Sequence, residues 1–262
     1  MTAPAMLAPQ SLTPDLVCLP AVLPVPDHGI LPVNAFVIRG PEPVLVDTGL
    51  AALGADFMAA LETVIDPVDL RWIWLSHMDA DHTGNLRQVL AAAPQARVVT
   101  NFLGMGKMNL LGLPLEAVHL LAPGAALDLP GRSLVPLRPP YYDAPESTGF
   151  FDTGSRALFC VDSFGALLPA MAETAAAIDV AVLREGMAGW SAIDAPWLAA
   201  ADRAALADAL GDIRRLDPAV LLSAHLPPAF AMAGRLTALV GDLYCSGQAV
   251  APDRETFARL AA

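Results

Sequence analysis

The segment "SHMDADHTG" (76–84) places two histidines and two aspartates within six positions, directly after the apolar run "LRWIWL". The apolar run predicts a buried strand, and the following "HTGNLRQVLAAAP" predicts a helix that stops at a proline. If the connecting loop stays extended, alternate side chains converge on one point, and the last histidine turns away as the helix begins. The spacing therefore predicts ligands for two adjacent metal ions, with His77 and Asp79 on one, and Asp81 and His82 on the other.

Neither aspartate alone would justify this prediction. Aspartate is favoured at helix N-caps, so Asp81 could simply cap the helix and Asp79 could be a solvated loop residue. Four metal-ligating residue types in six positions, at the end of a buried strand, favour the metal-site interpretation. Two further candidates end other predicted strands, Asp162 in "SRALFCVDSF" and His225 in "AVLLSAH". Functional sites of α/β proteins collect at such strand ends.

The segment "SHMDADHTG" resembles the H-x-H-x-D-H metal motif of the metallo-β-lactamase superfamily. Three more segments resemble the superfamily in the same order: "VLVDTG" (44–49), "LFCVDSFG" (158–165) and "LLSAH" (221–225). The resemblance implies that Asp162 bridges the two metals, that His225 is the last ligand and that Asp47 is a hydrogen-bonding residue beside the site. It also implies the α/β metallo-β-lactamase fold, an αββα sandwich in which two mixed β-sheets are flanked by helices.

Asp79 departs from most hydrolases of that superfamily, which have histidine at this position. A carboxylate there is typical of the flavodiiron proteins and of their free-standing relatives, the oxygen-binding diiron proteins, whose motif is H-x-E-x-D-H. Asp79 is the shorter homologue of that glutamate. The sequence "DSFG" after the bridging aspartate also resembles this branch.

A second departure lies in "PPYYDAPESTGFFDTG" (139–154), where the family has a histidine and this chain has none. Asp143 falls at the matching place and is the predicted replacement, with Glu146, Tyr142 and Asp152 as alternatives. Tyr142 is predicted to lie beside the ligands, where its hydroxyl could hydrogen-bond to what they bind. The first metal would then have His77, Asp79, Asp143 and Asp162, and the second would have Asp81, His82, Asp162 and His225.

Three histidines and four aspartates make a harder and more anionic donor set than a tris-histidine zinc site. Such a set suits iron or manganese, while zinc remains an alternative because metal availability also decides occupancy. We therefore expect two metal ions, with iron favoured. Two functions compete: a di-iron protein that binds or reduces a diatomic gas (O2 or NO), and a binuclear hydrolase of an ester, lactone or phosphodiester. A metal-storage or relic site is a third interpretation.

The elements that position these residues alternate between strands and helices, as in a layered α/β domain. We expect a hairpin over 33–49, helices over 50–65, 82–94, 202–216, 230–244 and 253–262, and strands over 70–76, 96–101, 155–164 and 219–225. Residues 102–135 are expected to mix a short helix with loop. Residues 1–30 are expected to form a proline-rich arm, followed by a single metallo-β-lactamase-like domain over 31–262.

The net charge of −12 argues against nucleic acid and anionic membranes as partners, because both require basic surface. No apolar run is long enough to span a bilayer, and the three scattered cysteines fit a reducing compartment, which predicts a cytoplasmic protein. The 262 residues leave no room for a flavodoxin-like domain, so no FMN is expected in this chain. The expected partners are a small-molecule or gas ligand, an electron-transfer partner and a second copy in a homodimer.

Overall fold

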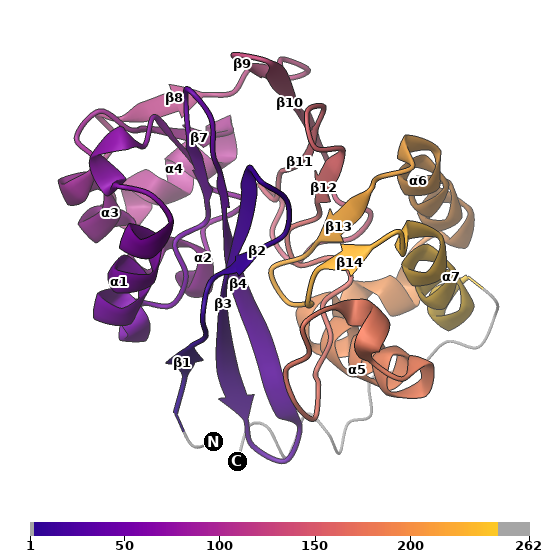
Figure 1. Ribbon diagram of the computed structural model, residues 1–262. Helices are drawn as coiled ribbons and strands as arrows, with labels where there is room; N and C mark the ends of the chain where they lie inside the picture. The colour runs from indigo at the N-terminus through magenta and orange to yellow at the C-terminus, as the bar shows by residue number, and fades with distance from the viewer. Residues whose placement is uncertain (1–2, 246–262) are drawn as a thin grey trace.

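The computed structural model describes residues 3–245, which form two β-sheets packed face to face with helices on their outer sides (Figure 1). The first sheet has eight strands in the order β1-β3-β4-β5-β6-β7-β8, with β2 also paired to β3. Its strands are β1 (Ala5–Met6), β2 (Gln10–Ser11), β3 (Leu16–Val25), β4 (Gly29–Ile38), β5 (Val44–Val46), β6 (Trp72–Trp74), β7 (Arg97–Thr100) and β8 (Val118–Leu120). Pairing is antiparallel up to β5 and parallel from β5 to β8, so the sheet is mixed.

The second sheet has six strands in the order β14-β13-β12-β11-β10-β9. These are β9 (Leu127–Leu129), β10 (Arg132–Leu137), β11 (Gly149–Asp152), β12 (Ala157–Phe159), β13 (Val220–Leu222) and β14 (Ala229–Phe230). Only β12 and β13 pair in parallel, so this sheet is also mixed.

Helices cover the outer face of each sheet (Figure 1). The α-helices beside the first sheet are α1 (Gly54–Val64), α2 (Ala80–Thr83), α3 (Leu86–Ala92) and α4 (Phe102–Leu110), and those beside the second are α5 (Val180–Asp194), α6 (Arg203–Leu216) and α7 (Ala233–Tyr244). Four 3-10 segments complete the order: η1 (Ala51–Leu53), η2 (Pro67–Asp69), η3 (Ala175–Ala177) and η4 (Pro196–Ala200). None of these helices is both long and apolar enough to cross a bilayer.

Aromatic side chains fill the space between the sheets. Phe36 of β4 contacts Phe159 of β12 edge-on, with ring centroids 5.4 Å apart, and Trp74 of β6 lies 4.5 Å from Phe150 of β11. Separate apolar clusters lie under α1 and α3 on one side and under α5, α6 and α7 on the other. The layers are therefore helix, sheet, sheet, helix, and the predicted αββα sandwich is confirmed.

The prediction that residues 1–30 form an arm is wrong, because most of this segment belongs to the first sheet. All ten residues of β3 pair with β4, from Leu16 opposite Ile38 to Val25 opposite Gly29. A proline such as Pro20 fits in β3 because its backbone hydrogen-bonding side faces away from β4. On that side, next to β1, the carbonyl of Pro20 accepts the N–H of Leu7. A proline on that side interrupts only short edge pairings, so β3 stays intact.

The other expected helices and strands are partly confirmed. The hairpin, which forms between β4 and β5, and the strands that end near the metal motif, Asp162 and His225 are confirmed. Helices over 50–65, 82–94, 202–216 and 230–244 are confirmed with shifted ends. Strands β8 to β11 and helix α5 were not predicted, and the helix expected over 253–262 lies outside the described residues.

Candidate metal centre

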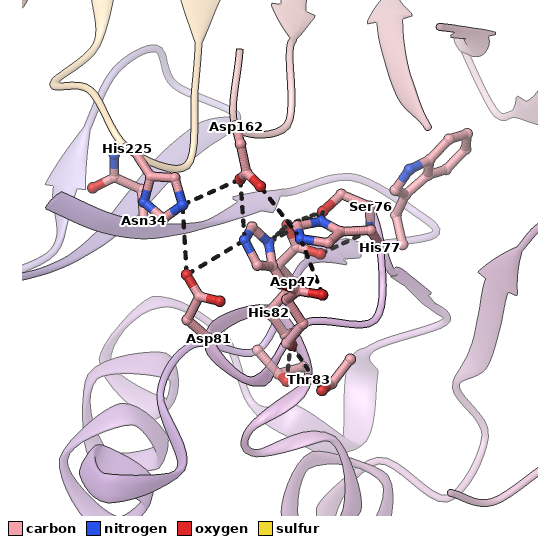
Figure 2. A network of polar contacts seen from close by, with 12 residues as sticks. Asn34, Asp47, Ser76, His77, Asp81, His82, Thr83, Asp162 and His225 are labelled. Carbon is pink, nitrogen blue, oxygen red and sulfur yellow. Dashed lines mark hydrogen bonds and ion pairs between the residues drawn. The ribbon is translucent and has the colours of Figure 1, made fainter. Parts of the chain in front are cut away.

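The candidate ligands lie in loops that follow strands of both sheets, apart from Asp81 and His82 in the short helix α2. Figure 2 shows five of their side chains pointing toward one another, those of His77, Asp81, His82, Asp162 and His225. His77 follows β6, Asp162 follows β12 and His225 follows β13, each within three residues of the strand end. Asp143 comes from the loop between β10 and β11. Carboxyl ends of strands from two facing sheets therefore meet at this edge of the sandwich.

Asp162 lies at the middle of the cluster and is 3% exposed. Its Oδ1 is 3.1 Å from His82 Nε2 and 3.2 Å from His225 Nε2, while its Oδ2 is 3.3 Å from His77 Nε2. One carboxylate thus faces imidazoles on both sides. This is the arrangement that a residue bridging two metal ions requires.

The other candidate ligands divide into two groups around Asp162. On one side His77 Nε2 lies 3.9 Å from Asp79 Oδ1 and 3.8 Å from Asp143 Oδ2. On the other side Asp81 Oδ2 lies 3.5 Å from the Nε2 atoms of both His82 and His225 (Figure 2). Apart from Asp162, these are the members of the two predicted sets, and each group of three has ligand atoms within 4.8 Å of one another.

Hydrogen bonds behind two histidines direct the Nε2 lone pairs toward the cluster. His82 Nδ1 lies 2.9 Å from Asp47 Oδ2, and His225 Nδ1 donates to the carbonyl oxygen of Pro32 at 2.7 Å. A donor role at Nδ1 leaves Nε2 as a neutral acceptor, which is the form that binds metal. Asp47 also accepts from the N–H and hydroxyl of Ser76, so it lies behind the ligands, as the sequence predicted.

The buried atoms at the centre need a cation. His77 Nε2, His82 Nε2 and Asp162 Oδ1 are buried without hydrogen-bond partners. When Nδ1 donates, each Nε2 is an acceptor facing a carboxylate, which is also an acceptor. Buried polar atoms without partners cost several kcal/mol. Metal ions would satisfy these atoms, so the residues fit a two-metal site.

The electrostatics of the cluster point the same way. Burial lowers the pKa of His225, but the Asp162 carboxylate outweighs burial and raises that pKa to about 9. The pKa of His82 is also raised, again by Asp162 against the effect of burial. Burial raises the pKa of Asp162, yet His77 and the other imidazoles hold it well below its ordinary value. Without metal, protons therefore take the place that cations would occupy.

The backbone around the centre holds unusual conformations. Asp47 and Val161 have positive φ angles of 59° and 57°. A β-branched residue in that region is strained, and such strain concentrates at functional sites. At Gly84 a Cβ would lie 2.4 Å from the carbonyl oxygen of Gly49, so the "DTG" and "HTG" segments pack too closely for a side chain there.

Three residues named from the 139–154 stretch make other contacts. Tyr142 packs on Trp197 and under the guanidinium of Arg138, and no contact found within residues 3–245 joins it to the centre. Glu146 is buried against Lys107, with 2.6 Å between Oε1 and Nζ. Asp152 pairs with Arg132 at 2.8 Å. Of this stretch, Asp143 alone joins a group of candidate ligands in the described residues.

Sequence reasoning missed Asp194, the last residue of α5. One of its carboxylate oxygens lies within 4.8 Å of those of Asp143 and Asp162. Burial, followed by the charge of Asp162, raises the pKa of Asp194 to about 8. A single aspartate in an unpredicted helix carries no signal of its own. The helix could have been found from Asp179, which caps it, and from its buried spacing of Leu183, Gly186 and Met187.

A family model described as "ODP family beta lactamase" matches residues 31–225, which hold every candidate ligand. The chain belongs to this family. This match, together with the relatives described next, confirms the predicted resemblance to the flavodiiron branch of the metallo-β-lactamase superfamily.

The ODP-family chain is similar to two curated relatives over half of its length and shares its fold with a solved structure. It is 33% identical over 136 residues to the type A flavoprotein fprA of Rhodobacter capsulatus, covering 50% of this chain and 31% of the relative. It is 29% identical over 136 residues to the anaerobic nitric oxide reductase flavorubredoxin of Salmonella arizonae, covering 50% and 28%. The rubredoxin oxygen:oxidoreductase of Desulfovibrio gigas superposes with a TM-score of 0.79 at 17% identity, covering 89% and 61%. The matches thus span about a third or less of the two relatives' own length.

Proposed function

We propose that this domain holds two metal ions, iron in the first place, and that it binds or reduces a diatomic gas, O2 or NO. The observation that carries the proposal is the central Asp162, with imidazoles and carboxylates arranged on both of its sides. The names of the relatives, a nitric oxide reductase and an oxygen oxidoreductase, support the same chemistry. Zinc and manganese are the alternative metals.

The chain's own residues account for how the ions would be held. His77, Asp79, Asp143 and Asp162 would hold the first, and Asp81, His82, Asp162 and His225 the second. Asp47 and the carbonyl of Pro32 fix the orientation of two imidazoles. Two adjacent ferrous ions would supply electrons and an open coordination position to the gas. Each carboxylate adds negative charge, which stabilises the higher charge of an oxidised centre.

Electrons for gas reduction would come from a separate partner. That this chain binds no FMN stays a prediction. We further propose a cytoplasmic location, which is consistent with the free cysteines Cys18, Cys160 and Cys245. A single metallo-β-lactamase-like domain that includes strands β1 to β3, and that can pair with a second copy, is part of the same proposal. Tyr142 is proposed not to bind metal itself, and its hydroxyl would hydrogen-bond to the molecule that the metal ions bind.

The first experiment is elemental analysis of the purified protein, paired with visible spectra before and after reduction and re-exposure to air. We expect about two irons per chain and an absorption band that changes with O2. Two zinc ions and no spectral response would contradict the proposal and favour metal-dependent hydrolysis of an ester, lactone or phosphodiester. One metal per chain would show that Asp143 does not replace the missing histidine.

A further inference from the structure

Asp194 ends helix α5 and faces the centre from outside every segment that carries the sequence motif. One of its carboxylate oxygens lies within 4.8 Å of carboxylate oxygens of Asp143 and Asp162. Its Oδ2 is buried and has no hydrogen-bond partner within the described residues. The centre is therefore approached by one more carboxylate than the motif supplies.

Contacts on either side of Asp194 fix the end of α5 against the centre. Trp190, one turn earlier, packs on His225 with ring centroids 4.9 Å apart. The hydroxyl of Ser191 lies 2.6 Å from that of Tyr244 on α7. The Trp190 ring is so close to the loop after Asp162 that a Cβ on Gly165 would lie 2.5 Å from it. This packing holds Asp194 at the centre.

The side of the centre that Asp194 approaches has the greater excess of negative charge. Its donors are the carboxylates of Asp79, Asp143 and Asp162 and a single imidazole, that of His77, whose Nε2 has no hydrogen-bond partner. The second group has two imidazoles, His82 and His225. A buried carboxylate without a partner is costly unless a cation or a donor compensates it. A metal ion beside Asp143 and Asp162 would compensate the carboxylate of Asp194 as well.

We propose that Asp194 is a further carboxylate ligand of the metal ion held by His77, Asp79 and Asp143. Together with Asp143 it would supply the coordination that the absent histidine leaves open. This inference rests on the proposed two-metal function. It adds a residue from the second sheet's helical layer to a site that is otherwise built from loops and the short helix α2.

The test is an anaerobic titration of metal-free protein with Co2+, followed by calorimetry and by the visible absorption of the bound ion. Wild-type protein is expected to bind two Co2+ ions. In Asp194→Asn we expect the affinity for one ion to fall at least tenfold and the absorption of that ion to change, since even residues behind the ligands contribute tenfold or more. Glu185→Gln, an exposed acid on the same helix, is the matched control and should bind like wild type.

Thermal melting separates a ligand role from a packing role. Because Asn has nearly the same shape as Asp and introduces no charge, metal-free Asp194→Asn should melt close to the temperature of metal-free wild type, but should gain less from Co2+. Unchanged affinities and spectra would overturn the inference and leave the proposed function standing. A lower melting temperature with an unchanged spectrum would likewise assign Asp194 to packing. No Co2+ binding by wild type would overturn both proposals. If Asp194→Asn does not fold, Asp194→Ser takes its place in the same comparison.

Discussion

Asp162 differs from the other candidate ligands because both of its oxygens face imidazole nitrogens. Oδ1 approaches His82 and His225, and Oδ2 approaches His77. Asp81 contacts imidazoles of the second group only. The two aspartates should therefore differ in how many ions their loss removes.

We expect Asp162→Ala to lose both metal ions and Asp81→Ala to keep one. The reason is that the first variant removes a ligand from both groups, whereas the second leaves the group of His77, Asp79 and Asp143 intact. Metal content per folded chain, measured after gel filtration, checks this expectation. Two ions retained by Asp162→Ala would show that Asp162 does not bridge.

At the residue scale the sequence predicted much of the site. His77, Asp79, Asp81 and His82 could be recognised because four ligand types in six positions are rare. Asp143 was recognised only by comparison with the family's missing histidine, because nothing in "YYDAP" itself marks a ligand. Asp194 was not recognised at all, since its place depends on packing of a helix far along the chain.

At the level of elements, the main errors had local physical causes. The prolines of β3 suggested an irregular arm, but their missing N–H groups fall on the side away from β4. Helix α5 has two glycines in "VAVLREGMAGWSAID", which weaken its helical pattern. One of them, Gly186, packs directly on the carbonyl of Leu167, so its role is close contact with the loop after Asp162.

The loop that carries Asp143 depends on helix α4 through a buried ion pair. Glu146 has a side chain with no exposed surface, and it contacts Lys107, the one lysine of the chain. Asn101, which caps α4, also donates to the carbonyl of Glu146 at 2.7 Å. Helix α4 therefore fixes the position of this loop relative to the centre.

We expect Lys107→Met to lower the free energy of unfolding by about 2 kcal/mol, because it leaves a buried carboxylate unpaired. Lys107 is partly exposed, so the loss should be smaller than for a fully buried pair. Urea denaturation measures the change. The matched variant is Lys107→Met combined with Glu146→Gln, which should recover most of the loss. Equal losses in both variants would show that the ion pair contributes little.

At the scale of the whole molecule, the centre lies between the two halves of the sandwich. Asp79 and Asp81 follow β6 of the first sheet, while Asp143, Asp162 and His225 follow strands β10, β12 and β13 of the second. Ions held there would connect the halves, so metal binding should stabilise the fold as a whole.

The thermal stability of the metal-free protein should fall as the pH rises from about 6.5 to about 9. His225 has a folded pKa of about 9 against an ordinary value of 6.5, so its proton stabilises the fold fully below pH 6.5 and is lost as the pH rises through 9. Asp194, raised from 3.8 to about 8, contributes in the same direction. Melting curves of metal-free and metal-loaded protein across this range check the effect.

The metal-loaded protein should keep its melting temperature over the same interval, since cations replace the protons. If the melting temperature of the metal-free protein does not change between pH 6.5 and 9, then His225 and Asp194 do not hold protons in this interval. A fall of equal size in both forms would place the titrating groups away from the centre.

The bond between His225 and Pro32 has a consequence for biosynthesis. It joins residues 193 positions apart, and the amide of Asn34 in the same strand donates to the carbonyls of Ser223 and Leu226. A growing chain on the ribosome presents Pro32 and the first strands long before the segment that carries His225 exists. Until translation passes that segment, a nascent chain could offer one group of ligands but not the other. Metal binding at the complete centre would therefore follow synthesis, and the metals available in the cell at that moment would decide which one the finished protein carries.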